Sequence, residues 1–267
     1  KIGVLAPESA RGAVRELFLS HVIGGKGLSS RAEFARIVTG ATPDVVLTGV
    51  ETLAEVLGED VVVVDVGGAT TDVHSVVAPD PEAADVREEV VQVTPVTRTV
   101  EGDLGMRWSA PSTLQAADRA DPSLAESDHA LLTSQAQHRH DHPGWLPATE
   151  QDQDVDELLA RLAVGTALQR HAGRSRVVLG EGGKVVERTG TDLRRVGLVV
   201  GSGGVLRHGR DGIAERVLRW STTGGWQLPE RPRLVVDEHY VLAAVGLLAR
   251  THPAAARKLA GTLPARR

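Results

Sequence analysis

The chain has 267 residues, a net charge of −5 at pH 7 and no cysteine, and 41% of its residues are hydrophobic. This length and apolar content allow one large or two modest packed domains. The acidic charge excludes the basic field of a nucleic-acid-binding protein, and the lack of cysteine excludes disulfides, a thiol nucleophile and thiolate metal ligands. No apolar run approaches the roughly 20 residues that span a bilayer, so we expect a cytoplasmic protein without membrane segments.

The first third of the chain predicts helices followed by strands. Apolar residues at helical spacing predict a helix over 8–22, and a second helix follows to about residue 38. The run Val45–Leu47 predicts a short buried strand. A short helix over 51–57 and three strands at 61–66, 71–78 and 89–99 complete this part.

Helical patterns dominate after residue 102 and then alternate with strands. The predicted elements are helices over 103–118, 123–137 and 154–171, a hairpin over 176–187, strands at 198–200 and 234–236, and helices over 205–220 and 238–250. Asp237 is well placed to cap the last helix. Three antiparallel strands followed by alternating units predict an α/β fold with a mixed five-stranded sheet and flanking helices.

The segment 65–72, Asp-Val-Gly-Gly-Ala-Thr-Thr-Asp, connects two apolar strand patterns. Paired glycines let the chain turn sharply and let a ligand approach backbone N–H groups, which together form a concave anion site. Hydroxyls add donors, and the flanking carboxylates are candidates for catalysis and for holding Mg²⁺. The candidate residues are Asp65, Gly67, Gly68, Thr70, Thr71 and Asp72. They suit the β- and γ-phosphates of a nucleotide; the alternative is an ordinary hairpin turn. No Gly-Lys-Ser/Thr follows, so the segment is not a P-loop.

A second glycine-rich turn follows the strand pattern at 198–200. It consists of Gly201, Ser202, Gly203 and Gly204, and it precedes a predicted helix. Glycines at such a position let a ring or a phosphate lie against the backbone. A flexible connector is the alternative. Two glycine turns at strand ends of one sheet can converge on one ligand, which favours a binding site. Ser202 has no adjacent pair of a histidine and an acidic residue, so a hydrolase triad has no support.

Three other groups are weaker candidates. The polar segment 137–144 predicts an exposed loop, and its histidines, His138, His140 and His142, with Asp141 offer a transition-metal site as the less favoured alternative. His74 is interpreted as a core or edge residue rather than a general base. Asp103 is either a helix cap or a carboxylate that serves Mg²⁺ or its bound water.

The residues 61–72 resemble the second phosphate motif of the sugar kinase, Hsp70 and actin superfamily, and 198–204 resemble its adenosine motif. More narrowly, the segment 65–75 (Asp-Val-Gly-Gly-Ala-Thr-Thr-Asp-Val-His-Ser) resembles the MutL family associated with glutamate mutase, which is distinct from the mismatch repair protein of the same name. The segments 101–106, 170–173 and 237–244 are similar to that family too.

The resemblance implies an actin-like ATPase (RNase H-like) domain. Residues 1–58 would be the end of a first actin-like domain, and 59–267 the second, with a helical insertion at about 103–175. It implies ATP or ADP with Mg²⁺ as ligands: phosphate contacts at Gly67, Gly68 and Thr70, a magnesium-water role at Asp65, and adenosine contacts at Gly203 and Gly204.

The resemblance also implies an accessory protein that maintains or reactivates an adenosylcobalamin-dependent mutase such as glutamate mutase. The alternatives are a small-molecule kinase or ATP-coupled hydrolase of the same superfamily, and a nucleotide-free scaffold. The superfamily's first phosphate motif, Asp-x-Gly-x-Thr, does not occur in 1–58. We therefore expect either a fragment or a degenerate site, and little ATP hydrolysis by these residues alone.

Overall fold

The computed structural model describes residues 42–78, 95–120, 126–180, 183–220 and 223–264, together with Ala13 and Leu17. The helices predicted over 8–22 and up to 38 lie outside these ranges, apart from Ala13 and Leu17, which are helical. The first part of the strand predicted over 89–99 also lies outside them.

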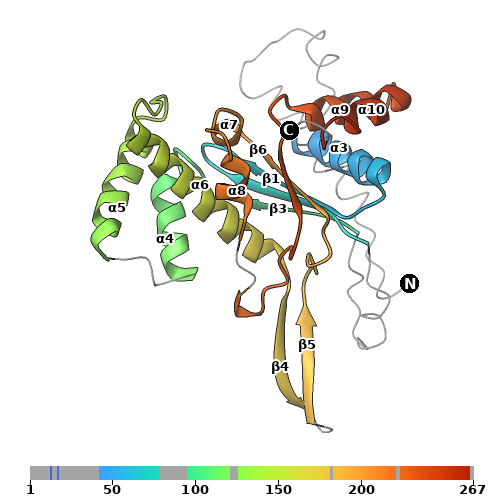
Figure 1. Ribbon diagram of the computed structural model, residues 1–267, viewed down its shortest axis with the longest axis horizontal. Coiled ribbons are helices and arrows are strands. Elements are labelled where there is room, and N and C mark those ends of the chain that lie inside the picture. The colour runs from blue at the N-terminus through green and yellow to red at the C-terminus, as the bar shows by residue number, and fades with distance from the viewer. Residues whose placement is uncertain are drawn as a thin grey trace.

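A five-stranded mixed sheet in the order β3-β2-β1-β6-β7 forms the centre of the fold (Figure 1). Its strands are β1 (Val61–Val66), β2 (Thr71–Val76), β3 (Val96–Glu101), β6 (Leu198–Ser202) and β7 (Arg233–Val236). β1, β2 and β3 are antiparallel neighbours, whereas β1, β6 and β7 run parallel. The sequence therefore predicted the strand number and the mixed character of the sheet correctly.

Helices cover both faces of the sheet, as Figure 1 shows. The helices are α3 (Thr42–Leu57), α4 (Ala110–Ala120), α5 (Glu126–Asp141), α6 (Glu150–His171), α7 (Gly204–Arg207), α8 (Ile213–Leu218), α9 (Val241–Ala249) and α10 (Pro253–Ala260). Val62 and Val64 of β1 belong to a core with α4, α6 and α8, whereas Val61 and Val63 belong to a second core with α3, α9 and α10. Strand alternation thus gives a valine-rich central strand one hydrophobic core on each face.

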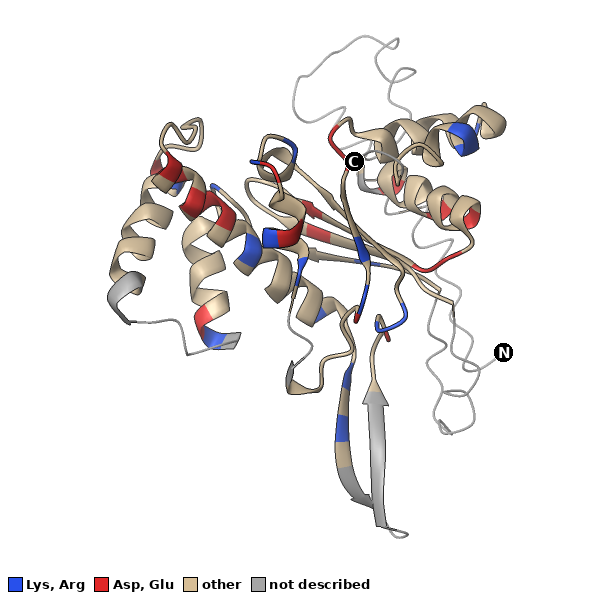
Figure 2. Cartoon of the chain, in the orientation of Figure 1, with Lys and Arg blue, Asp and Glu red and all other residues tan. Residues whose placement is uncertain are grey.

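A two-stranded ribbon, β4 (Arg174–Gly180) and β5 (Gly183–Thr189), extends away from the sheet (Figure 1). This ribbon confirms the hairpin predicted over 176–187. Figure 2 shows acidic and basic residues interspersed over the described helices and loops. Within the described ranges, no helix is both long enough and apolar enough to cross a membrane.

Several local predictions are wrong, and three of them concern the elements next to the sheet. Val45–Leu47 lies inside α3 rather than in a strand, because the apolar face of this 16-residue helix, including Val50 and Leu53, packs in the core with α9. The predicted helix over 205–220 is two short helices, interrupted where Gly212 takes a left-handed conformation with φ of 78°. The predicted helix over 103–118 begins only at Ala110, because residues 104–109 bond to the β1–β2 turn instead.

Candidate functional site

The two glycine turns lie side by side at one edge of the sheet. β1 and β6 are parallel neighbours, so their carboxyl ends point the same way, and Asp65 lies opposite Ser202 in the register. β7 continues the same edge: the Asp237 N–H donates to the Gly201 carbonyl at 2.8 Å. Residues that are distant in sequence therefore meet at the carboxyl ends of three parallel strands, where ligands of open α/β sheets bind.

The β1–β2 turn has backbone N–H groups that bind no other described backbone group. The Gly67 N–H donates to the Thr70 carbonyl within the turn at 2.9 Å. No described residue accepts a backbone hydrogen bond from the N–H of Gly68, Ala69 or Thr70. Of the residues predicted to contact phosphate, Gly68 and Thr70 keep a free N–H, and Gly67 uses its own to shape the turn. Three successive N–H groups of this kind suit an anion.

A loop after β3, residues 104–109, which we call the clamp loop, holds this turn. The backbone N–H groups of Met106 and Arg107 donate to the carbonyls of Gly67 and Gly68, at 2.9 and 2.8 Å. The Ser109 hydroxyl donates to the Ala69 carbonyl at 2.6 Å. The clamp loop therefore occupies the carbonyl oxygens of residues 67–69 and leaves the turn's N–H donors exposed. Sequence reasoning missed this loop.

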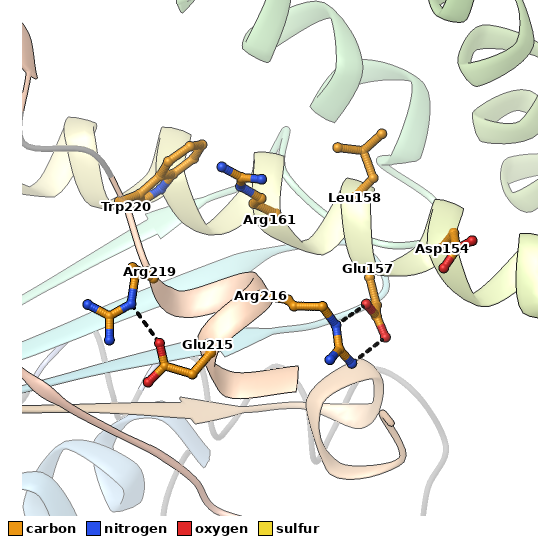
Figure 3. A pocket seen from close by; sticks show the side chains of 8 residues that line it. All are labelled: Asp154, Glu157, Leu158, Arg161, Glu215, Arg216, Arg219 and Trp220. Carbon is orange, nitrogen blue, oxygen red and sulfur yellow. Dashed lines mark hydrogen bonds and ion pairs between the residues drawn. The ribbon is translucent and has the colours of Figure 1, made fainter. Parts of the chain in front are cut away.

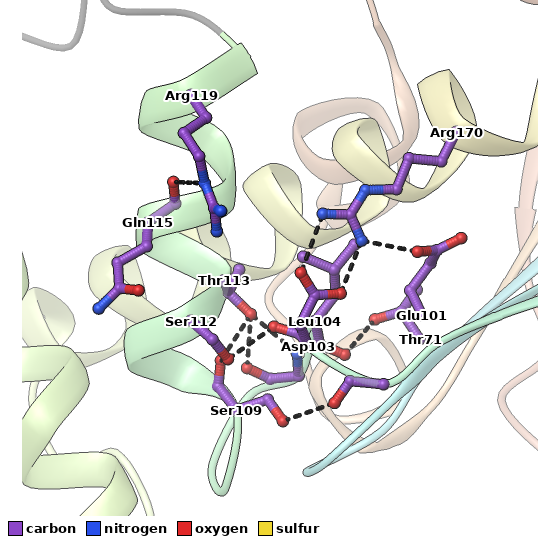
Figure 4. Close-up of polar contacts among 12 residues, drawn as sticks. Thr71, Glu101, Asp103, Leu104, Ser109, Ser112, Thr113, Gln115, Arg119 and Arg170 are labelled. Atoms are coloured by element: carbon purple, nitrogen blue, oxygen red, sulfur yellow. Dashed lines mark hydrogen bonds and ion pairs between the residues drawn. The ribbon is translucent and has the colours of Figure 1, made fainter.

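The clamp loop is itself fixed to its surroundings (Figure 4). The Thr71 hydroxyl donates to the Leu104 carbonyl at 3.0 Å, and the Gly105 N–H donates to the Thr113 hydroxyl at 2.8 Å. A Cβ atom at Gly105 would lie 2.7 Å from the Gly68 carbonyl oxygen, so only glycine lets the loop approach so closely. Thr71, one of the predicted site residues, thus helps to hold the turn through its side chain.

Three aspartates lie at this edge in different environments. Asp72 forms an ion pair with Arg98, with 2.5 Å between the Asp72 Oδ1 and the Arg98 Nη2. Asp237 is buried and accepts from the N–H groups of Val241 and Leu242 at 2.7 and 2.9 Å, which confirms the predicted cap of α9. Asp65 lies opposite Ser202 in the register, and the Ser202 side chain favours its charged form.

The environment of Asp65 disfavours its negative charge. Burial raises the pKa of the Asp65 carboxyl above its ordinary value, and the Ser202 hydrogen bond lowers it. The charges of Asp72 and Asp237 raise the pKa further. A cation at this carboxylate would relieve both the desolvation and the repulsion.

Asp103, the other predicted magnesium residue, is engaged elsewhere. Its two carboxylate oxygens accept from the Arg170 guanidinium at 2.6 and 2.9 Å, and Glu101 accepts from the same guanidinium at 2.6 Å (Figure 4). The hydrogen bonds from Arg170 lower the pKa of the Asp103 carboxyl. Asp103 does not cap α4, which begins at Ala110. In the described part of the chain, no group of three or more histidine, aspartate or glutamate side chains is arranged to hold a metal ion.

The β6–α7 turn is held against β1 by a glycine that nothing else can replace. Gly203 has φ of 107° and ψ of 163°, a region open essentially to glycine alone, and a Cβ there would collide with the Val66 carbonyl oxygen. At Gly204, by contrast, a Cβ would meet no atom within 4 Å. The two glycines therefore differ: Gly203 brings β6 close to β1, and Gly204 leaves open space beside the turn.

The histidine predictions have two outcomes. His138 and His140 lie in the last turns of α5 and His142 just after it, so the predicted loop is wrong over 137–141. His142 and His138 stack with ring centroids 4.6 Å apart, and the His142 ring nitrogen Nδ1 bonds to the His138 carbonyl. His74 is buried on β2, which confirms its interpretation as a core residue.

A separate cavity of about 540 Å³ lies between α6 and α8 (Figure 3). Charged side chains dominate its lining, and they pair with one another. Glu157 of α6 accepts from Arg210 at 2.8 Å and from Arg216 at 2.6 Å, and Arg219 pairs with Glu215 at 2.6 Å. The Arg216–Glu157 pair joins α8 to α6, Arg210 joins the segment before α8 to the same glutamate, and the Arg219–Glu215 pair is local to α8. The two glycine turns are the stronger candidate site, because they have backbone N–H groups without a described partner and a carboxylate, Asp65, whose charge is disfavoured by burial.

The mixed sheet with helices on both faces and paired glycine turns at its edge is consistent with an actin-like α/β protein. The chain matches the family described as "MutL protein" over residues 1–262. It is 33% identical to "Protein MutL" of Clostridium tetanomorphum over 261 residues, which cover 95% of this chain and 56% of that protein. The chain therefore belongs to the MutL family, as the segment 65–75 predicted, and spans little more than half the length of this relative.

Proposed function

We propose that this chain is the nucleotide-binding part of an accessory protein that maintains or reactivates an adenosylcobalamin-dependent mutase such as glutamate mutase. Membership of the MutL family supports the accessory role. The observation that carries the nucleotide assignment is the β1–β2 turn, whose carbonyls at 67–69 are occupied while the N–H groups of 68–70 are free. Such a turn binds an anion with phosphate geometry.

The proposed ligand is ATP or ADP with Mg²⁺. Gly68, Ala69 and Thr70 would donate to the phosphates, and the open space beside Gly204 would receive the adenosine. Asp65 would hold Mg²⁺ or its bound water, because its carboxylate is destabilised by burial and by like charges. Mg²⁺ would neutralise charge that develops on the phosphates during transfer. Asp72 and Asp103 are held in ion pairs with Arg98 and Arg170, so the proposal gives them no direct contact with the nucleotide or with Mg²⁺.

Calorimetry with Mg-ADP tests the nucleotide assignment. At Gly68, a Cβ would lie 3.6 Å from the Arg107 Cβ, so the side chain of Gly68→Val would press on the clamp loop and change the shape of the phosphate-binding turn. We expect this variant to lose Mg-ADP binding. Gly144→Val, at a position with open space in the α5–α6 loop, is the matched control and should bind normally. Equal affinity of both variants would remove the phosphate assignment.

Turnover and the partner require the full-length protein. Asp65→Asn should lower its ATPase rate by about a hundredfold or more, the usual scale of an electrostatic or general-base contribution. An unchanged rate would make Asp65 structural. We also expect ATP-dependent recovery of an inactivated adenosylcobalamin mutase. Turnover that instead requires a small acceptor would identify a kinase, and absence of nucleotide binding would identify a scaffold.

A further inference from the structure

We infer that Arg107 is a positioning residue that fixes the anion-binding shape of the β1–β2 turn and couples this turn to the helices α5 and α6. The inference rests on the proposed function, because it concerns phosphate recognition at the same turn. It adds a residue outside the glycine motif, and a route by which occupation of the turn reaches the helical layer.

Arg107 touches the turn with its backbone and with its stem. Its N–H donates to the Gly68 carbonyl at 2.8 Å. Its Cβ and Cγ lie 3.6 and 3.8 Å from the position of a Cβ on Gly68, so the aliphatic stem backs the glycine directly. The side chain therefore limits how far the turn can move away from a phosphate.

The guanidinium of Arg107 anchors the stem in the helical layer. It donates to Asp156 of α6 at 3.1 Å and to the Met106 carbonyl at 2.7 Å. Asp156 is buried and also pairs with Arg139 of α5 at 2.5 Å. One carboxylate thus joins the clamp loop to two helices. Because the pairs are shielded from water, they are screened less than surface pairs.

Arg139 gives this junction a defined geometry. It is fully buried, donates to the Gln135 side chain at 2.9 Å and to the Asp152 carbonyl at 3.0 Å, and lies 4.8 Å from the Trp145 ring centre. Together with the ion pair to Asp156, these contacts fix the Arg139 guanidinium in one position. A shift of Arg107 therefore moves Asp156 against a rigid neighbour, which couples the turn to α5 and α6.

The test compares Arg107→Met, which keeps the stem and removes the anchor, with Arg107→Lys and with the control Arg170→Met. Arg170 pairs with Glu101 and Asp103 beside the clamp loop, without a described contact to the turn. The readouts are the affinities for Mg-ADP and for adenosine, and hydrogen exchange without nucleotide at positions 67, 106 and 107, whose N–H groups make the hydrogen bonds within the turn and between the clamp loop and the turn.

We expect Arg107→Met to weaken Mg-ADP binding by about tenfold or more, because the variant lacks the charge-assisted hydrogen bond from Arg107 to Asp156 that holds the turn in place. Its affinity for adenosine should be unchanged. Exchange at positions 67, 106 and 107 should accelerate while β6 amides stay protected. Arg107→Lys should recover part of the affinity, and Arg170→Met should match the wild type. In the wild type, Mg-ADP should slow exchange in α5 and α6; in Arg107→Met it should not.

An unchanged ratio of ADP to adenosine affinity in Arg107→Met, with unchanged exchange at positions 67, 106 and 107, would overturn the inference. A wild type that binds neither ligand would defeat the proposed function instead, and exchange at these three positions would still decide the positioning role. Should Arg107→Met fail to fold, Ser109→Ala removes the 2.6 Å bond to the Ala69 carbonyl from a surface hydroxyl, and it should shift the ratio in the same direction.

Discussion

Two buried histidines should make this protein lose stability as the pH falls from 7 to 5. Burial lowers the pKa of His74 from its ordinary value of 6.5 to about 4. Burial also lowers the pKa of His171 to about 4, and the neighbouring His74 contributes. In the folded protein both rings are neutral at pH 5, whereas in the unfolded chain both are mostly protonated.

The sign and size follow from proton linkage. A depressed folded-state pKa means that the unfolded chain binds more protons between pH 4 and 6.5, so stability is present above this window and lost as pH falls through it. With pKa values of 6.5 and about 4, one histidine contributes a loss of about 2 kcal/mol between pH 7 and pH 5, and two contribute about 4 kcal/mol. Asp65 and Glu51, whose pKa values are raised, act in the opposite direction.

The variant His74→Leu isolates one histidine. The ring nitrogen Nδ1 of His74 has no hydrogen-bond partner among the described residues, so a leucine of similar volume removes no described bond at that atom. Urea unfolding at pH 7 and pH 5, extrapolated to water, gives the stability change of each protein. We expect the variant to lose about 2 kcal/mol less than the wild type over this pH range.

The carboxylates are common to both proteins, so the difference between them reports His74 and its effect on the neighbouring His171. His239→Gln, at an exposed position after β7, is the control and should follow the wild type. If His74→Leu and the wild type lost the same stability between pH 7 and pH 5, the assignment of a buried neutral His74 would be refuted.

Two further predictions concern the edge of the sheet that carries the site. Gly203→Ala should destabilise the fold by about 3 kcal/mol, because alanine is strained at this φ and ψ and would collide with the Val66 carbonyl oxygen. Gly204→Ala should fall within about 0.5 kcal/mol of the wild type. Thermal unfolding of both variants checks this, and equal stability of the two variants would contradict it. Asp237→Ala should lower the stability of the fold by about 2 kcal/mol, because it leaves two buried N–H groups of α9 without acceptors. Asp237→Asn should recover part of this loss. If urea unfolding shows the asparagine variant to be no more stable than the alanine variant, capping is not the main role of Asp237.

The central hairpin and the long helix α6 could be predicted because their signals are local. Consecutive valines before Gly67-Gly68 and alternating residues after them allow one register, and β1 and β2 follow it. The helix predicted over 154–171 agrees with α6, whose start is fixed by the Thr149–Asp152 capping box. The predicted start was late by four residues because this box precedes the apolar stripe.

The wrong predictions arise where packing overrides a short pattern. Val45–Leu47 has the composition of a strand, yet it lies in α3, whose apolar face packs in the core with α9. Residues 104–109 have helical spacing, yet the β1–β2 turn accepts the backbone N–H groups of Met106 and Arg107. In both cases a distant segment, which no local pattern contains, decided the conformation.

The sequence by itself determined the elements of the site: a glycine turn after β1, a glycine turn after β6, and carboxylates beside them. It could do so because backbone freedom and side-chain charge are properties of single residues and their neighbours. Only the tertiary structure decided how these parts are used. Asp65 on β1, Asp72 on β2 and Asp237 after β7 lie at the same edge of the sheet, but Asp72 pairs with Arg98 and Asp237 caps α9. The buried junction of Arg107, Asp156 and Arg139 joins segments up to 49 residues apart. Long-range pairing of this kind depends on where the chain folds back on itself, and composition and spacing do not encode it in any one segment.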